Sequence, residues 1–310
     1  MDLNGQPEDV QKQWLAEADG FVLFSHSHVD GEFLDGCPNL GIIFTPSVGF
    51  DSIDAVECAK RGVWVTNGAG SITETTADLA LCLMLGASRH LGSNHMEMKM
   101  DPAASSSNWF GGPEGLGDDL TNKTLGVCGF GRIGQNLAQK CRVAFNMRIL
   151  YYDAFHVRHG VTGAEQVSFE ELLRESDFIS INSVLDESSY HLFGAEEFAM
   201  MKKGSYLINA ARGPLVDEEA LAEALTSGHL GGAGLDVYEI EPPAFKEDGT
   251  TGPCDALRNA PTVFLQPHIG SATTAARQEQ QFLAVRNIRA VFVEGRGPLT
   301  PVNSPLNPKL

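Results

Sequence analysis

Short apolar runs alternate with helix-like patterns along most of the chain. Each run is bounded by glycine or polar residues, as buried strands commonly are. The runs lie at 21–24, 41–44, 63–66, 125–128, 148–152, 178–182, 206–208, 234–237 and 262–265. Helical patterns cover 53–61, 73–91, 133–144, 169–174 and the stretch that begins at Asp217. Strands that alternate with helices predict parallel sheets with crossover connections, and therefore an α/β fold.

Two α/β domains are expected from the length and from one break in the pattern. A chain of 310 residues suggests about two domains. Residues 101–119 are rich in Ser, Gly and Pro, which is typical of a surface connection. Ser52 is expected to cap the helix at 53–61, and Gly62 to close it.

A glycine fingerprint follows the strand at 125–128. Gly129, Gly131 and Gly134 form G-x-G-x-x-G at the start of a helix. In this motif the first glycine permits a tight turn, the second lets the backbone approach a pyrophosphate, and the third permits close packing of helix on strand. The helix N-terminus favours the negative phosphates. The pattern predicts a Rossmann-type dinucleotide site, although glycines also serve ordinary turns.

An acidic residue in the next strand supports this prediction and bears on cofactor choice. Asp153 ends the run at 148–152 and lies 153 − 134 = 19 residues beyond Gly134. The motif expects an acid about 20 residues on, bonded to a ribose 2′-hydroxyl. Its charge would repel a 2′-phosphate, so NAD(H) is favoured over NADP(H). Arg158 and His156 lie nearby in the sequence, so NADP(H) remains an alternative cofactor.

Composition narrows the class of protein. The formal net charge of −18 argues against nucleic acid or an anionic membrane as the main partner. None of the six cysteines forms a C-x-x-C pair, which favours reduced thiols in a cytoplasmic protein and neither a disulfide framework nor a metal site. The polar N-terminus shows no signal peptide. The final Pro-Lys-Leu resembles a peroxisomal address only loosely, so peroxisomal import is a minor alternative.

Six ordered motifs resemble the D-isomer-specific 2-hydroxyacid dehydrogenase family. They are SVGFDSID (47–54), TTADLAL (75–81), LGVCGFGRIG (125–134), NAARGPLVDEEAL (209–221), GAGLDVYEIEPP (232–243) and QPHIGSAT (266–273). The resemblance implies a Rossmann-type NAD-binding domain at 92–271. It also implies a smaller flavodoxin-like substrate domain built from 1–91 and 272–310, with the active site between the two.

The resemblance also implies roles for individual residues. Arg212 would bind the substrate carboxylate and carbonyl, and Glu241 would orient His268 for proton transfer. Val48 and Gly49 would hold the carboxylate through backbone N–H groups. Asp236 would bond the nicotinamide amide. Further cofactor contacts would come from Gly129, Gly131, Arg132, Ile133, Gly134, Asp153, Ala210, Ala211, His268 and Gly270.

The residue types suit the reduction of a 2-keto acid. Arginine offers a planar, permanently charged fork for a carboxylate. Histidine can donate a proton near neutral pH, and a carboxylate on its other nitrogen fixes the tautomer. Simpler roles are possible for each residue. Arg212 could pair with Asp217 or Glu218, Glu241 could be a solvated residue before two prolines, and His268 could cap a turn.

This sequence departs from the family pattern at several places. The strand and helix that usually precede the first apolar run are missing, so we expect a shortened substrate domain that is less stable. Asn67-Gly68-Ala69 and Val184-Leu185 replace more common family residues, and 245–257 lengthens the loop between Glu241 and His268. Trp109 and the SVG form of the substrate loop resemble members that act on small substrates.

The predicted function is hydride transfer between NAD(H) and a small D-2-hydroxy acid or 2-keto acid, with glyoxylate or hydroxypyruvate favoured. Alternatives are a phosphoglycerate-type dehydrogenase, a non-catalytic NAD(H)-sensing protein of the corepressor type, and an inactive remnant. A cytoplasmic homodimer is expected, with its contact on the helix at 73–91 and the loop around Trp109. The only other expected partner is the small-molecule acid.

Overall fold

The computed structural model describes residues 3, 5–23, 28–100, 116–155, 160–242, 244 and 249–309. It divides into two compact units, one of residues 1–72 and 272–310 and one of residues 73–271. Each unit has its own parallel sheet, and the α/β class is therefore confirmed.

The larger unit contains a seven-stranded parallel sheet in the order β10-β9-β8-β7-β4-β5-β6. Its strands are β4 (Thr124–Cys128), β5 (Arg148–Tyr152), β6 (Ala164–Gln166), β7 (Phe178–Ile181), β8 (Tyr206–Asn209), β9 (Gly232–Leu235) and β10 (Val263–Leu265). Strands β7, β8 and β9 are buried at every position, which explains their unbroken apolar or small-residue character.

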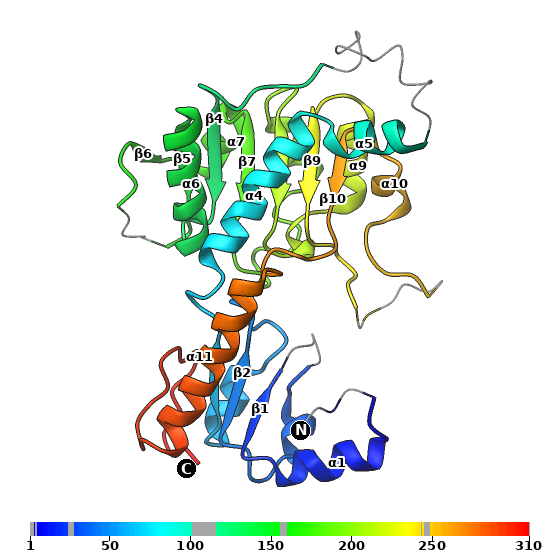
Figure 1. Cartoon of the computed structure of the whole chain (residues 1–310). Coiled ribbons are helices and arrows are strands. Elements are labelled where there is room, and N and C mark those ends of the chain that lie inside the picture. The colour runs from blue at the N-terminus through cyan, green and yellow to red at the C-terminus, as the bar shows by residue number, and fades with distance from the viewer. Residues whose placement is uncertain are drawn as a thin grey trace. The chain divides into compact units, whose positions relative to one another are not determined.

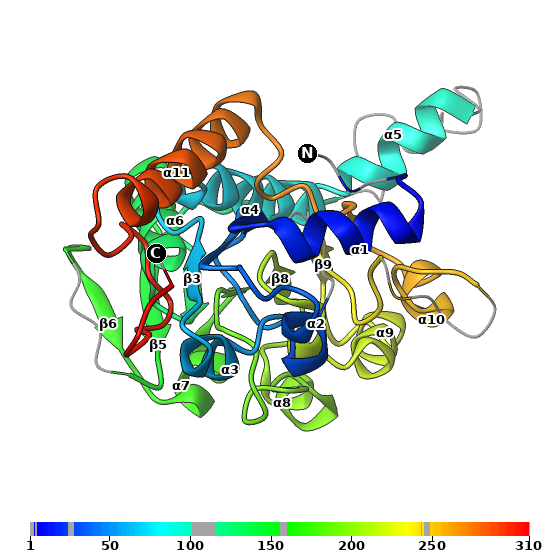
Figure 2. The same ribbon diagram turned by 90° about the horizontal axis from the view of Figure 1, so that it is seen from below.

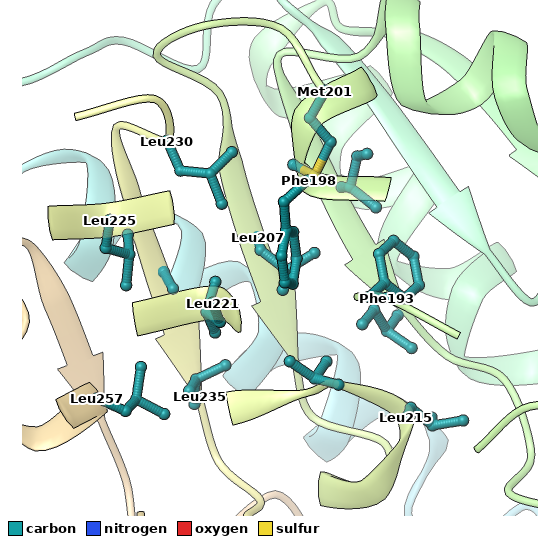
Figure 3. Close-up of a cluster of buried hydrophobic side chains, with 14 of the residues drawn as sticks. Phe193, Phe198, Met201, Leu207, Leu215, Leu221, Leu225, Leu230, Leu235 and Leu257 are labelled. Carbon is teal, nitrogen blue, oxygen red and sulfur yellow. The ribbon is translucent and has the colours of Figure 1, made fainter. Parts of the chain in front are cut away.

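Helices cover both faces of this sheet (Figure 1). One face carries α4 (Thr73–Ser88) and α6 (Arg132–Phe145), with α5 (Leu91–Met100) beside β10. On the other face lie α7 (Phe169–Glu175), α8 (Ala195–Met200), α9 (Glu218–Thr226) and α10 (Asp255–Arg258). Figure 3 shows the core of this second face, where Leu221 and Leu225 of α9 pack near Leu207 and Phe198. The core fixes the strand ends that carry the candidate site.

The smaller unit is a three-stranded parallel sheet in the order β1-β2-β3. Its elements are α1 (Glu8–Glu17), β1 (Gly20–Val22), α2 (Gly31–Asp35), β2 (Ile42–Thr45), α3 (Ala55–Lys60), β3 (Trp64–Asn67) and α11 (Thr274–Phe292). Helices α2 and α3 pack on one face and α11 on the other, as the view in Figure 2 also shows. The C-terminal segment runs beside β3, where Val302 N–H donates to the Val65 carbonyl.

Several element boundaries differ from the prediction for identifiable reasons. The helix predicted at 73–91 ends at Ser88, because the chain turns at His90, whose φ is +51°, before α5 begins at Leu91. Helix α3 begins at Ala55, since the Asp54 carboxylate, and not Ser52, accepts the Glu57 N–H at 2.8 Å. Strand β6 was missed because it is a short, mostly exposed edge strand without an apolar run.

The division into units also differs from the sequence-based one. The prediction put residues 73–91 in the smaller domain, but α4 belongs to the larger unit because it packs against α6, β8 and β9. The second break falls between Ser271 and Ala272. Trp109, His156, Arg158 and residues 245–248, which entered the sequence-based predictions, lie outside the described residues.

Candidate active site

The glycine loop joins β4 to α6 and has the geometry that a pyrophosphate needs. Gly129 has a φ of +91°, and a Cβ there would lie 2.6 Å from the backbone of Asn182 and Ser183. A Cβ on Gly134 would overlap the Gly129 carbonyl oxygen, so only glycine allows helix and loop to approach this closely. By contrast, a Cβ on Gly131, the N-cap of α6, would meet nothing within 4 Å.

The contrast among the three glycines indicates what the loop can hold. The protein's own packing requires Gly129 and Gly134. Gly131 instead borders unoccupied space at the N-terminus of α6, the positive end of the helix dipole. Backbone N–H groups of this first turn suit phosphate oxygens. The residues present therefore fit a dinucleotide cofactor.

Asp153 lies beside the glycine loop, directly after β5. Its Oδ2 accepts the Phe130 N–H at 2.6 Å, and its Oδ1 accepts the Phe155 N–H at 2.9 Å. The carboxylate thus ties the glycine loop to the end of β5. Sequence motifs alone gave no sign of this anchoring contact, because it joins two turns 23 residues apart.

Arg212, Glu241 and His268 follow β8, β9 and β10, which are adjacent in the sheet. The carboxyl ends of parallel strands meet at one edge, so the sheet gathers these three segments there. The sharp turn after β8 is the 3-10 helix η2 (Gly213–Leu215). A Cβ on Gly213 would overlap the Tyr238 carbonyl, so this glycine permits the segments after β8 and β9 to touch.

Glu241 and His268 form a direct pair. His268 Nδ1 lies 2.6 Å from Glu241 Oε2, while Glu241 Oε1 accepts the Tyr238 N–H at 2.9 Å. Because an ionised carboxylate can only accept, Nδ1 donates to Glu241, and this bond fixes the proton on Nδ1. The His268 side chain is 37% exposed and that of Glu241 16%, so the ring is accessible and its partner is shielded.

Asp236 holds the turn that carries the histidine. It is fully buried, and its two carboxylate oxygens accept the N–H groups of Ile269 and Gly270, both at 2.7 Å. Its carbonyl accepts the His268 N–H at 2.8 Å. Burial raises the pKa of the Asp236 carboxyl, and the two N–H bonds oppose this shift. The positive φ of His268, +53°, is stabilised by these contacts.

Arg212 is half-buried at the start of η2. Its guanidinium donates to the Ala211 carbonyl at 2.8 Å. The Asn209 side chain stabilises this turn with two hydrogen bonds. Its amide donates to the Arg212 carbonyl at 2.8 Å and accepts the Ala211 N–H at 3.0 Å. Ala210 and Ala211 therefore belong to a turn with defined geometry next to the arginine.

The two acids proposed as salt-bridge partners of Arg212 have other contacts. The Asp217 carboxylate caps α9 through the Ala220 N–H. The Glu218 carboxylate, on a residue only 5% exposed, accepts the N–H groups of Glu239 and Cys254 at 2.8 and 2.6 Å. The sequence did not mark Glu218 as an anchor of the segment before Glu241, because an acid in a first helical turn usually acts on its own helix.

Val48 and Gly49 lie in the smaller unit, in the loop after β2. Ser47 O accepts the Gly68 N–H at 2.8 Å, and Val48 O accepts from the Asn67 amide at 2.7 Å. Within the described part of the chain, the N–H groups of Val48 and Gly49 have no hydrogen-bond partner. The loop thus presents two donors in succession.

Comparison with known proteins identifies the family. Residues 81–270 match the model of the D-isomer specific 2-hydroxyacid dehydrogenase, NAD binding domain. The chain belongs to this dehydrogenase family. It is 40% identical to the glyoxylate reductase of Thermococcus litoralis over 310 residues, which covers 97% of this chain and 88% of that protein.

Solved structures of this dehydrogenase family share the fold. The D-lactate dehydrogenase of Aquifex aeolicus, complexed with NAD and lactic acid, has a TM-score of 0.81 at 29% identity and covers 98% of this chain and 91% of its own. The NADPH-dependent glyoxylate/hydroxypyruvate reductase of Sinorhizobium meliloti, in complex with NADP and malonate, has the same TM-score and identity and covers 97% and 87%.

Membership fixes the reaction class: this dehydrogenase is an NAD(P)-dependent oxidoreductase that acts on a CH–OH group, with a Rossmann-type NAD-binding domain. All six cysteines are free thiols. No helix among the described residues is long and apolar enough to cross a membrane.

Proposed function

We propose that this dehydrogenase reduces a small 2-keto acid, with glyoxylate or hydroxypyruvate as the substrate and NADH as the favoured cofactor. The observation that carries the proposal is the 2.6 Å pair of His268 and Glu241 on strand ends adjacent to Arg212. It provides a proton donor with a fixed tautomer beside a permanent cation. The similarity to glyoxylate reductases supports the choice of a small substrate.

Each residue has a distinct proposed task. The Arg212 guanidinium binds the substrate carboxylate and carbonyl oxygen, and the N–H groups of Val48 and Gly49 hold the carboxylate. His268 Nε2 gives a proton to the carbonyl oxygen as it becomes a hydroxyl, while Glu241 stabilises the positive ring before that transfer. Bound NADH supplies the hydride for the carbonyl carbon.

The cofactor is proposed to lie along the glycine loop. The N–H groups at Arg132 and Ile133 bind its pyrophosphate, and Asp153 favours a ribose with an unmodified 2′-hydroxyl. Ala210, Ala211 and Gly270 are proposed to lie against the cofactor at the ends of β8 and β10. Asp236, which the sequence predicted as a contact of the nicotinamide amide, is fully buried and is proposed to support this end of the site by holding Ile269 and Gly270. NADP(H) is a second possibility, since a related reductase was solved with NADP.

The deciding measurement is the loss of NADH absorbance when the purified protein meets glyoxylate, hydroxypyruvate or pyruvate, with NADPH in parallel. We expect turnover with glyoxylate or hydroxypyruvate. A phosphorylated keto acid, 3-phosphohydroxypyruvate, tests the phosphoglycerate-type alternative. Binding of NADH without turnover on any of these acids would refute the reductase and favour a non-catalytic NAD(H)-binding protein.

We further propose that the enzyme is a cytoplasmic homodimer. None of the residues of α5 is buried, and its apolar side chains Leu91, Met96, Met98 and Met100 are 49%, 56%, 44% and 77% exposed. A partner subunit would remove this surface from water. The free thiols suit a reducing compartment. Sedimentation should give twice the 33.4 kDa chain mass, and a Met96→Glu, Met100→Glu variant should sediment as a monomer.

A further inference from the structure

The substrate loop of the smaller unit is tied down by its carbonyl groups. The carbonyls of Pro46, Ser47, Val48 and Gly49 each accept a hydrogen bond from within that unit. The donors are the Gln280 amide at 3.0 Å, the Gly68 N–H at 2.8 Å, the Asn67 amide at 2.7 Å and the Ser47 hydroxyl. Four consecutive carbonyls therefore have fixed directions.

Fixing a carbonyl also fixes the next N–H. In a trans peptide the C=O of one residue and the N–H of the following residue lie in one plane and point in opposite directions. The bond to Ser47 O therefore directs the Val48 N–H away from Gly68, and the bond to Val48 O directs the Gly49 N–H away from Asn67. The bond from Gln280 to the Pro46 carbonyl fixes the preceding peptide plane, which contains the Ser47 N–H and leads into the other two.

Gln280 is the most unusual member of the set because it is buried. The side chain is 1% exposed on α11, whose other buried positions include Ala276, Leu283 and Ala284. A primary amide in such surroundings destabilises the fold unless it is hydrogen-bonded. Here Nε2 donates to Pro46 O, and Oε1 accepts from the Arg277 guanidinium at 3.2 Å. The arginine thus fixes the amide with its donor toward the loop.

Close contact with β3 completes the support. A Cβ on Gly68 would overlap the Pro46 carbonyl oxygen, so the loop can occupy this place only beside a glycine. Asn67 is held in turn, since its Oδ1 accepts the Ala69 N–H and its carbonyl accepts from the Thr300 hydroxyl at 2.7 Å. The Asn67-Gly68-Ala69 sequence therefore supports the loop through the side chain of Asn67 and through the absence of a side chain at Gly68.

We propose that Gln280 is a positioning residue for substrate binding, which anchors through the Pro46 carbonyl the start of the loop that presents the Val48 and Gly49 N–H groups to the substrate carboxylate. This inference rests on the proposed function. The carboxylate lies away from the bond that changes, so the loop binds substrate and transition state alike. Loss of the hydrogen bond from Gln280 should therefore raise KM for the keto acid and leave kcat nearly unchanged.

The test compares Gln280→Met with wild type and with Gln281→Met. Methionine keeps the length of the side chain and leaves the Pro46 carbonyl without its donor, whereas Gln281 is an exposed residue of the same helix. We expect KM for glyoxylate to rise about tenfold in Gln280→Met, on the scale of one lost buried hydrogen bond. The kcat should stay within about twofold and the dissociation constant for NADH should not change. Gln281→Met should match wild type.

A second readout does not depend on turnover. Malonate titrated into 15N-labelled protein should shift the Val48 and Gly49 amide signals, and its affinity should fall about tenfold in Gln280→Met. Asn67→Asp, which removes the donor to Val48 O, should weaken malonate binding in the same way and stands in if Gln280→Met does not fold. Wild-type KM and malonate affinity in Gln280→Met, or a lowered melting temperature alone, would overturn the proposal.

The two proposals can fail separately. A wild-type protein that reduces no keto acid, but whose Val48 and Gly49 amides bind malonate in a Gln280-dependent way, would refute the reductase and keep the loop assignment. Turnover of glyoxylate with unchanged KM in Gln280→Met would keep the reductase and refute the loop assignment.

Discussion

Two loops of the larger unit and one loop of the smaller unit are held by opposite chemistry. In the larger unit, carboxylates accept backbone N–H groups: Asp236 holds Ile269 and Gly270, and Glu218 holds Glu239 and Cys254. In the smaller unit, amides donate to backbone carbonyls, as Gln280 and Asn67 do to Pro46 and Val48.

The difference determines what each loop can offer a ligand. A peptide group held through its carbonyl keeps its N–H for other partners, so the loop of Val48 and Gly49 can bind an anion. Neutral amides also add no negative charge beside that anion, which matters in a chain of net charge −18. In the larger unit the carboxylates occupy N–H groups, and the side chains of His268 and Arg212 are the groups proposed to act on the substrate.

The largest expected effect is on proton transfer at the histidine. His268→Gln removes the ring that is proposed to donate a proton to the substrate oxygen, and kcat should fall by about 10²–10⁴. Affinity for NADH, measured by fluorescence, should stay near the wild-type value. Glu241→Gln, which keeps the shape of the partner but removes its charge, should show a smaller loss. Wild-type turnover in His268→Gln would show that the proton comes from elsewhere.

Next in size is the removal of a buried carboxylate from the larger unit. Glu218→Gln replaces an oxygen that accepts an N–H by an NH₂ group that cannot, so one of the two bonds becomes a clash of donors. The free energy of unfolding should fall by about 1–3 kcal/mol. Turnover should also fall, because Glu239 lies two residues before Glu241.

Denaturant titration of Glu218→Gln measures the first effect, and kcat the second. Glu223→Gln is the matched control, since Glu223 is exposed on the same helix. Equal stability of the two variants would mean that the carboxylate contacts of Glu218 do not anchor the segment before Glu241.

The smaller unit should respond differently to a steric change. Gly68→Ala places a methyl group against the Pro46 carbonyl, so the substrate loop must move. We expect KM for the keto acid to rise about tenfold while kcat and NADH affinity stay near wild type. Gly297→Ala, in the same unit, is the control, because a Cβ there would lie 3.9 Å from its nearest neighbour. A change in kcat alone would place the loop in the chemical step.

The sequence predicted the local features of the site and missed the contacts between distant residues. Features encoded by neighbouring residues, such as the glycine fingerprint and the strands after which Arg212 and His268 lie, were visible as local patterns. The contacts of Gln280 with Pro46 and of Glu218 with Cys254 join residues 234 and 36 positions apart. Nothing in the local sequence marks such pairs, because an amide in a helix and an acid in a first turn are ordinary there.

The smallest expected effect concerns Asp153, a carboxylate that both holds a loop and is proposed to face the cofactor. Asp153→Ala removes the charge that is proposed to disfavour a 2′-phosphate, so the ratio of kcat/KM for NADPH to that for NADH should rise several-fold, up to about tenfold. The same change releases the Phe130 N–H, so KM for NADH should also rise.

Asp153→Asn separates these two effects. Its amide oxygen can still accept the Phe130 N–H, although the bond from the Phe155 N–H is lost, and the negative charge is gone. Cofactor preference should therefore shift as in the alanine variant, with a smaller rise in KM for NADH. If both variants raise KM for NADH and NADPH equally, Asp153 acts only on the glycine loop and does not select the cofactor. Its carboxylate would then have the same purely structural use as that of Glu218.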